Sequence, residues 1–151
     1  MNELEKGALK GVKVLDFSTL LPGPLASLFL AETGAEVIKI ERPVTGDEMR
    51  LSHPKWNDES VSFSMLNRGK KSLCLDLKDQ SSKDILKPLI QTADIIIEQF
   101  RPGVMKRLGL DYESIKKINS KIIYVSITGY GQTGPKKMVA GHDLNYIGNT
   151  G

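Results

Sequence analysis

The feature that most constrains the fold of this chain is a regular alternation of short, β-branched runs with segments of helical spacing. The β-branched runs predict five strands, at residues 12–17, 36–41, 72–77, 94–98 and 122–127. Helices are predicted between them, at residues 25–33, 80–92, 104–108 and 112–119. Strands that alternate with helices form right-handed βαβ units around a parallel sheet. The sequence therefore predicts an α/β fold, with a parallel sheet flanked by helices.

Size, charge and hydropathy exclude several classes of protein. The chain has 151 residues, and a chain of this length can bury about 70% of its unfolded surface within one domain. Its net charge of +3 is spread along the sequence, so we expect no nucleic-acid partner. The longest apolar run, residues 20–31, contains two prolines and is too short to span a bilayer, so we expect no membrane partner.

The single cysteine, Cys74, excludes a disulfide framework within the chain and favours a reducing compartment. We therefore expect a cytoplasmic protein, or one of the mitochondrial or peroxisomal matrix if the source is a eukaryote. Cys74 lies in an apolar run and has no histidine near it in sequence. We predict a buried core thiol rather than a nucleophile.

Three cationic residues follow the ends of predicted strands. Arg42, Lys78 and Arg101 lie just after the second, third and fourth strand, respectively. Ligands of open parallel sheets bind beyond the carboxyl ends of the strands, and cations at that edge would suit phosphate groups. The alternative is that each residue simply ends a strand at the surface. The pattern alone leaves both interpretations open.

Two other segments carry or resemble functional motifs. The stretch Gly129–Gly134 matches the dinucleotide-binding pattern G-x-G-x-x-G, but Pro135 and two lysines follow where a helix is required, so we reject that interpretation. The glycines would instead let the backbone pass close to a ligand or to another strand. Residues 44–68 are polar and irregular, which is typical of a functional or mobile loop, and His53 within them is expected to be structural or exposed.

The stretch around His142 is the strongest candidate for chemistry. A histidine can accept and return a proton near neutral pH, which suits general acid and base catalysis. Its neighbour Asp143 would serve at the start of a helix, as an N-cap or first-turn acid. The plainer alternative makes His142 a partly buried loop residue.

Many motifs, in one order, resemble the CoA-transferase family III (the CaiB/BaiF type), which includes the α-methylacyl-CoA racemases. They lie at residues 9–16, 22–24, 34–43, 46–47, 67–72, 76–78, 100–103, 107–109, 128–135 and 141–143. The resemblance implies a Rossmann-like large domain, of which residues 1–151 form the N-terminal, CoA-binding part. A C-terminal remainder and a small second domain are expected to be absent, and the full-length family forms homodimers.

The resemblance also implies the residues of the CoA site. Arg42, Arg101 and Arg107 match the arginines that help to hold the CoA nucleotide. Weaker matches to the same groove are Lys78, Thr128, Gly129, Asp143 and Tyr146. Coenzyme A enters as the acyl-CoA substrate, and no metal is implied. The acyl group itself is not specified by this part of the chain.

The residue at position 142 bears on the reaction. Racemase-like members carry a histidine here as one of two acid/base groups beside the thioester, so His142 favours α-proton removal and return on a 2-methylacyl-CoA. The alternative is a CoA-transferase that works through an aspartyl-CoA intermediate. In both cases the partner aspartate is expected beyond Gly151, so we expect this chain alone to be inactive. A third alternative is a non-catalytic fragment that at most binds CoA.

Overall fold

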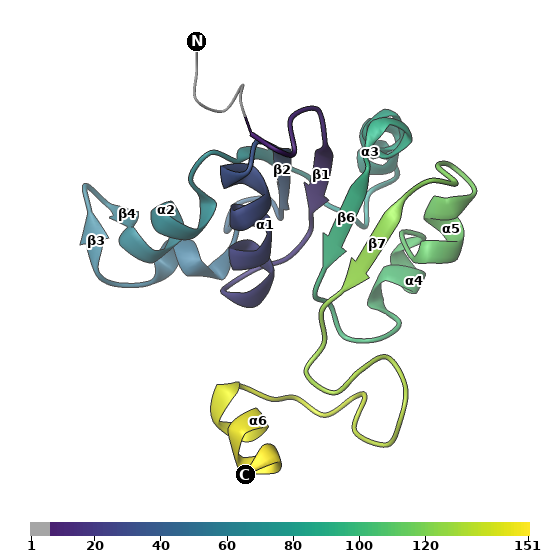
Figure 1. The fold of residues 1–151 in the computed structure, drawn as a ribbon. Coiled ribbons are helices and arrows are strands. Elements are labelled where there is room, and N and C mark those ends of the chain that lie inside the picture. Colours follow the sequence, from purple (N-terminus) through teal and green to yellow (C-terminus); the bar gives the residue numbers. More distant parts are fainter. Residues whose placement is uncertain (1–6) are drawn as a thin grey trace.

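The computed structural model describes residues 7–151, and its centre is a parallel sheet (Figure 1), which has five strands. The strands are β1 (Lys13–Asp16), β2 (Glu36–Glu41), β5 (Lys71–Cys74), β6 (Ile95–Glu98) and β7 (Ile123–Ser126). They lie in the order β5-β2-β1-β6-β7, and every neighbouring pair is parallel. The chain winds outward from β1 in one direction and then from β6 in the other, so the direction reverses between these two strands. In such sheets the crevice at this reversal is the usual ligand site.

Helices from the second half of the chain cover one face of the sheet. They are α3 (Gln80–Thr92), α4 (Val104–Leu108) and α5 (Tyr112–Lys116). Their apolar side chains, among them Leu86 and Ile115, pack against Leu15 and Ile96 of the central strands. This cluster is the larger of the two cores, and burial of its apolar surface is the main force that holds the sheet to these helices.

The opposite face changes character along the strands. Near the amino ends, Val14 and Val37 pack against Ala31 of α1 (Pro22–Glu32). Side chains on one face of a strand recur every second residue, so the same face carries Asp16 and Lys39 two residues further on. Both charged residues are fully or almost fully buried. The face is therefore apolar at one end and charged at the end where the strands finish.

The connection between β2 and β5 is more ordered than the sequence indicated. Residues 44–68 were predicted to be an irregular loop, and this prediction is wrong in part. They contain the 3-10 helix η2 (Glu48–Leu51), a hairpin of β3 (Lys55–Trp56) and β4 (Glu59–Ser60), and α2 (Val61–Asn67). The Ser60 hydroxyl caps α2 by accepting from Phe63 N at 3.3 Å, and α2 packs beside α1.

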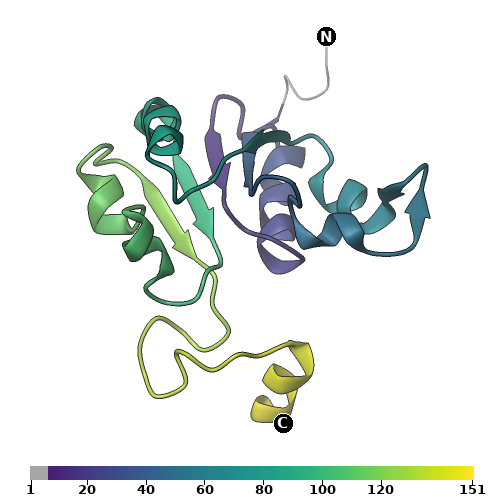
Figure 2. The same cartoon turned by 180° about the vertical axis from the view of Figure 1, so that it is seen from behind.

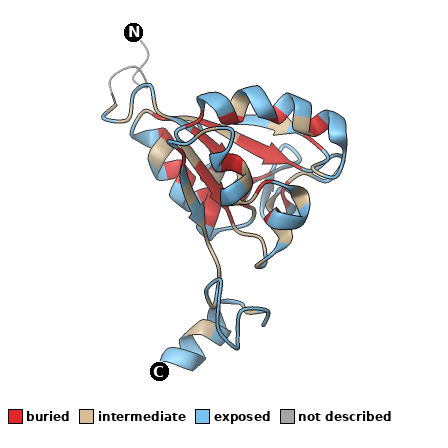
Figure 3. Cartoon of the chain, turned by 90° about the vertical axis from the view of Figure 1, so that its right-hand side faces the viewer, coloured by how far each residue is buried: buried red, intermediate tan, exposed pale blue. Residues whose placement is uncertain are grey.

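The chain beyond β7 leaves the body of the molecule. No helix or strand interrupts residues 127–142, and α6 (Asp143–Thr150) then lies beyond the carboxyl ends of the strands (Figures 1 and 2). Figure 3 shows this segment as exposed or intermediate throughout, and no residue from 128 to 151 is buried. No helix opens at Gly134, because the next helix, α6, begins only at Asp143, which agrees with the rejection of the dinucleotide motif.

Most of the predicted elements are confirmed, and their boundaries move by a few residues at most. The range 36–41 is a strand and 80–92 a helix, as predicted, while the first helix begins earlier, at Pro22. The prediction of a buried Cys74 is wrong, because this residue is exposed on β5, an outer strand with a neighbour on one side only. Among the described residues, no helix is long and apolar enough to cross a membrane.

Candidate functional site

Five of the predicted site residues lie just beyond the carboxyl ends of strands. They are Lys78 after β5, Arg42 after β2, Arg101 after β6, and Thr128 and Gly129 after β7. All five strands are parallel, so these ends meet at one edge of the sheet. The fold therefore brings the five residues to the same side of the molecule, although they come from positions far apart in the sequence.

The reversal point between β1 and β6 is bridged by Gln99, which sequence reasoning missed. Its Nε2 donates to Thr19 O at 2.7 Å, and its Oε1 accepts from Gly23 N at 3.1 Å. A Cβ on Gly23 would lie 2.1 Å from the Cβ of Ser18, so only glycine allows this close approach. One amide side chain thus joins the two turns that follow the central strands.

This bridge closes the anion site that the first helix of a Rossmann-type fold usually provides. Free N–H groups at a helix N-terminus normally hold a phosphate. In α1, Pro22 and Pro24 have no N–H, Gly23 N is bound by Gln99, and Leu25 N donates to Leu21 O. An anion at this edge must therefore be held by side chains or by other loops.

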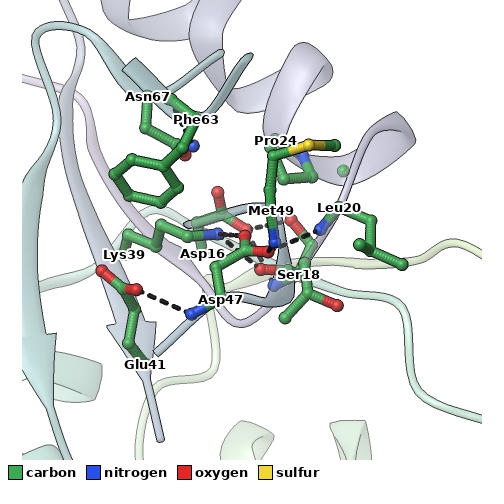
Figure 4. Close-up of polar contacts among 12 residues, drawn as sticks. Asp16, Ser18, Leu20, Pro24, Lys39, Glu41, Asp47, Met49, Phe63 and Asn67 are labelled. Carbon is green, nitrogen blue, oxygen red and sulfur yellow. Dashed lines mark hydrogen bonds and ion pairs between the residues drawn. The ribbon is translucent and has the colours of Figure 1, made fainter. Parts of the chain in front are cut away.

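A buried ion pair fastens the connection after β2 to the turn after β1 (Figure 4). Lys39 Nζ lies 2.8 Å from Asp47 Oδ2, and the two side chains are 1% and 0% exposed. Asp47 Oδ1 accepts from Leu20 N at 3.0 Å and from Met49 N at 2.9 Å. Lys39 also donates to Ser18 O at 2.7 Å. Asp47 therefore fixes two loops of the candidate site at once.

Glu41 makes a second tie beside the first. Its carboxylate accepts from Asp47 N at 2.9 Å, from Ser72 Oγ at 2.6 Å, and from Arg50 Nη2 at 2.7 Å. The guanidinium of Arg50 also stacks on the ring of Phe63, 3.7 Å from its centre. Burial alone would raise the pKa of Glu41, but the hydrogen bonds from Arg50, Ser72 and Asp47 N lower it to about 2.

Lys70 closes the cluster from the side of α2. Its ammonium group lies 3.6 Å from Asp16 Oδ2 and donates to Pro24 O at 2.7 Å and to Asn67 Oδ1 at 2.9 Å. Asp16 also accepts from the hydroxyl groups of Ser18 and Ser27. Burial lowers the pKa of Lys70 to about 8, although the charge of Asp16 opposes this shift.

These buried charges shape the edge and are not accessible to a ligand. The sequence does contain a signal for these buried charges. Lys39 and Asp16 stand at inward positions of their strands, since each follows an apolar core residue by two. A charged residue at such a position needs a partner of opposite sign.

Arg42 is presented at the surface beside this cluster. Its Nη2 lies 2.9 Å from Glu48 Oε1, and its Nε donates to Gly46 O at 3.1 Å. The side chains of Arg42 and Glu48 are 56% and 58% exposed. An exposed pair of this kind is weak, so a phosphate can replace the carboxylate at little cost.

Arg101 lines a cleft of about 350 Å³ at the ends of β6 and β7. Lys106, Glu98, Tyr124 and Gln132 contribute to the same lining. Neither Arg107 nor Lys78 does. Arg107 lies on α4 and Lys78 in the turn after β5. The structure thus aligns the predicted cations along one edge but does not enclose them in one pocket.

The predicted catalytic residue lies at the start of α6. His142 is the exposed N-cap residue, and its backbone N donates to Asn145 Oδ1 at 2.8 Å. Asp143 occupies the first turn, as the sequence predicted. The Tyr146 hydroxyl donates to Gly141 O at 2.8 Å. His53 is exposed, as expected.

A family model described as CoA-transferase family III matches residues 9–151. The chain belongs to CoA-transferase family III. It is 46% identical over 130 residues to an acetyl-CoA:oxalate CoA-transferase of Acetobacter aceti, covering 86% of this chain and 33% of that protein. It is 47% identical over 136 residues to a succinyl-CoA:glutarate CoA-transferase of Mus musculus, covering 89% of this chain and 31% of that protein. The chain therefore spans about a third of the length of these relatives.

Solved structures of the family have the same fold over this region. A CaiB/BaiF family protein of Brucella suis superimposes with a TM-score of 0.88 at 38% identity, covering 96% of this chain and 39% of that one. The protein Rv3272 of Mycobacterium tuberculosis superimposes with a TM-score of 0.88 at 39% identity, covering 96% and 40%. The Rossmann-like α/β fold that the motifs predicted is thereby confirmed.

Proposed function

We propose that this chain forms the CoA-holding part of an enzyme that transfers CoA between carboxylic acids. The observation that carries the proposal is the alignment of Arg42, Lys78 and Arg101 beyond the ends of three parallel strands. Because the N-terminus of α1 has no free N–H, these side chains are the natural partners for the phosphate groups of CoA. The curated relatives named above are CoA-transferases, which supports the same substrate class.

In this proposal the protein holds CoA mainly through its charged end. The two arginines offer paired N–H donors that match phosphate oxygens, and Lys78 adds a compact charge. Arg42 exchanges Glu48 for a phosphate when CoA binds. The buried ion pair of Lys39 and Asp47 keeps the loop of Arg42 in place, so the loop is not reordered on binding. The thioester end of CoA then extends toward α6.

Racemisation at the α-carbon of a 2-methylacyl-CoA is a second candidate, and the position of His142 favours it. The imidazole is exposed at the start of α6, beyond the carboxyl edge where the thioester would lie. Removal of a proton from one face and its return to the other need two groups, and the thioester supports the enolate between these steps. His142 would supply one of the two groups.

The experiment that tests CoA binding is calorimetric titration of the chain with CoA. Arg42→Ala and Arg101→Ala should each weaken binding about tenfold, as expected for the loss of a hydrogen bond between charged groups. Arg68→Ala is the matched control. Arg68 is also 56% exposed and paired with a carboxylate, but its partner Glu32 lies at the other end of α1. Unchanged affinity in both edge variants would refute the proposed site.

Inversion at the α-carbon tests the second candidate. With a single epimer of a 2-methylacyl-CoA, this chain alone should give no racemisation above background, because inversion needs a group on each face and His142 supplies one. Racemisation that is well above background and is abolished by His142→Ala would show that one group suffices.

A further inference from the structure

The ring of Tyr146 lies against two glycines from separate segments. A Cβ on Gly129 would lie 2.2 Å from the Tyr146 hydroxyl oxygen, and its three nearest atoms all belong to Tyr146. A Cβ on Gly141 would lie 2.7 Å from Cε1 of the same ring. The ring therefore fills the space that side chains at both positions would need. We call Gly129, Gly141 and Tyr146 the tyrosine clasp.

Further contacts fix the ring in this position. The Tyr146 hydroxyl donates to Gly141 O at 2.8 Å. Tyr130 meets the ring edge to face, with centres 5.3 Å apart, and Asn149 Nδ2 donates to the Tyr130 hydroxyl at 3.3 Å. No residue of α6 is buried, so the helix has no core of its own that could hold it to the sheet. The clasp joins the start of α6 to the end of β7.

His142 lies between two members of the tyrosine clasp, Gly141 and Tyr146, along the chain. It follows Gly141 directly, and its backbone N is bound by Asn145, the residue before Tyr146. We infer that Tyr146 is a positioning residue that places the His142 imidazole at the carboxyl edge, and that it does not contact CoA. The inference rests on the proposed function, in which the acyl thioester extends toward α6. It also gives the two glycines and the tyrosine one shared role.

The substitution Gly129→Ala tests the clasp directly. The backbone at Gly129 is not in the left-handed region, so the nearest obstacle to an alanine side chain is the ring of Tyr146, which alanine should displace. Gly148→Ala is the matched control, because a Cβ at this position in α6 meets no atom within 4 Å. In a Tyr146→Ala background, Gly129→Ala should have no additional effect.

NMR of histidine imidazole groups gives the readout, because the chain contains only His53 and His142. We expect Gly129→Ala and Tyr146→Ala to shift or broaden the His142 signals and to leave those of His53 unchanged. Addition of isobutyryl-CoA should shift His142 in the parent and in Gly148→Ala but not in Gly129→Ala. The affinity for CoA should stay within about twofold in Gly148→Ala, and isobutyryl-CoA is added to a saturating concentration for every variant.

Three results would overturn the inference. The first is a His142 signal in Gly129→Ala that matches Gly148→Ala. The second is a weaker affinity for CoA in Tyr146→Ala with unchanged His142 signals, which would make Tyr146 a CoA contact. The third is a parent His142 that does not respond to bound isobutyryl-CoA. Failure of the proposed function itself looks different: CoA does not bind, while the ligand-free signals still report the clasp.

Discussion

Two long connections leave the carboxyl edge of the sheet, and they are ordered in different ways. Residues 42–70 follow β2 and are fastened by buried ion pairs that include Lys39, Asp47 and Lys70. Residues 128–151 follow β7, contain no buried residue, and are joined to the strand end by the tyrosine clasp. Both carry glycine and polar residues, so composition alone does not separate them.

The difference lies in what the sheet presents to each connection. Beneath the first connection the strands carry Asp16, Lys39 and Glu41, whose charges are costly to bury unless they are paired. The connection supplies the partners, and the requirement for pairing selects one arrangement of the loop. β7 presents no buried charge to the second connection. The apolar residues of the second connection remain at the surface, and the side chain of Leu144, for example, is 82% exposed.

The largest expected effect comes from removal of one buried partner. Asp47→Ala leaves Lys39 without its ion pair and leaves two backbone N–H groups without an acceptor, so the free energy of unfolding should fall by about 3–5 kcal/mol. Urea unfolding measures this change, with exposed Asp84→Ala as the control. If Asp47→Ala does not fold, Lys39→Met/Asp47→Leu should be more stable than Asp47→Ala, because it removes the unpaired charge while the same two N–H groups stay without an acceptor. A loss below about 1 kcal/mol would remove the distinction between the two connections.

Acid should weaken the first connection selectively. The pKa of Glu41 is about 2 in the folded chain, below its ordinary value of 4.5. A lowered carboxyl pKa stabilises the fold above pH 4.5, and this contribution is lost as the pH falls toward 2. It amounts to at most about 3 kcal/mol. Glu41→Gln should flatten the acid limb of the stability curve, measured by urea unfolding at several pH values. An unchanged limb in Glu41→Gln would contradict this role.

The smallest effect is expected in the second connection. Leu144→Ala removes a side chain that is 82% exposed, so the free energy of unfolding should change by less than about 0.5 kcal/mol. Leu86→Ala, in the core beneath α3, should cost about 2–5 kcal/mol in the same urea assay. A large loss from Leu144→Ala would mean that α6 packs on the body of the domain.

The elements of the fold were predictable from local patterns, because each strand or helix leaves a periodic signal in its own residues. The range 36–41 and the helix 80–92 are examples. The charged cluster was not predicted, since Lys39 and Asp47 become partners only when β2 and its following loop fold together. The exposure of Cys74 depends on its place in an outer strand, which the chain order alone did not provide.

The candidate site could also be predicted only where its residues follow from local patterns. Cations at strand ends are visible in the sequence once the strands are placed, so Arg42, Lys78 and Arg101 were found. The contacts of Gln99 and of the Tyr146 ring were not predicted. Each depends on how closely backbone segments far apart in the sequence approach one another, and only the tertiary structure sets that distance.

Hydrogen exchange with and without CoA tests whether the carboxyl edge of the sheet binds CoA. We expect slower exchange with CoA in the segments that follow the strands, at residues 42–48, 76–79, 99–107 and 128–130. The segments that precede the strands, at residues 34–36, 69–71 and 119–122, should be unchanged. Protection of the preceding segments, or no protection at saturating CoA, would show that CoA does not bind at this edge.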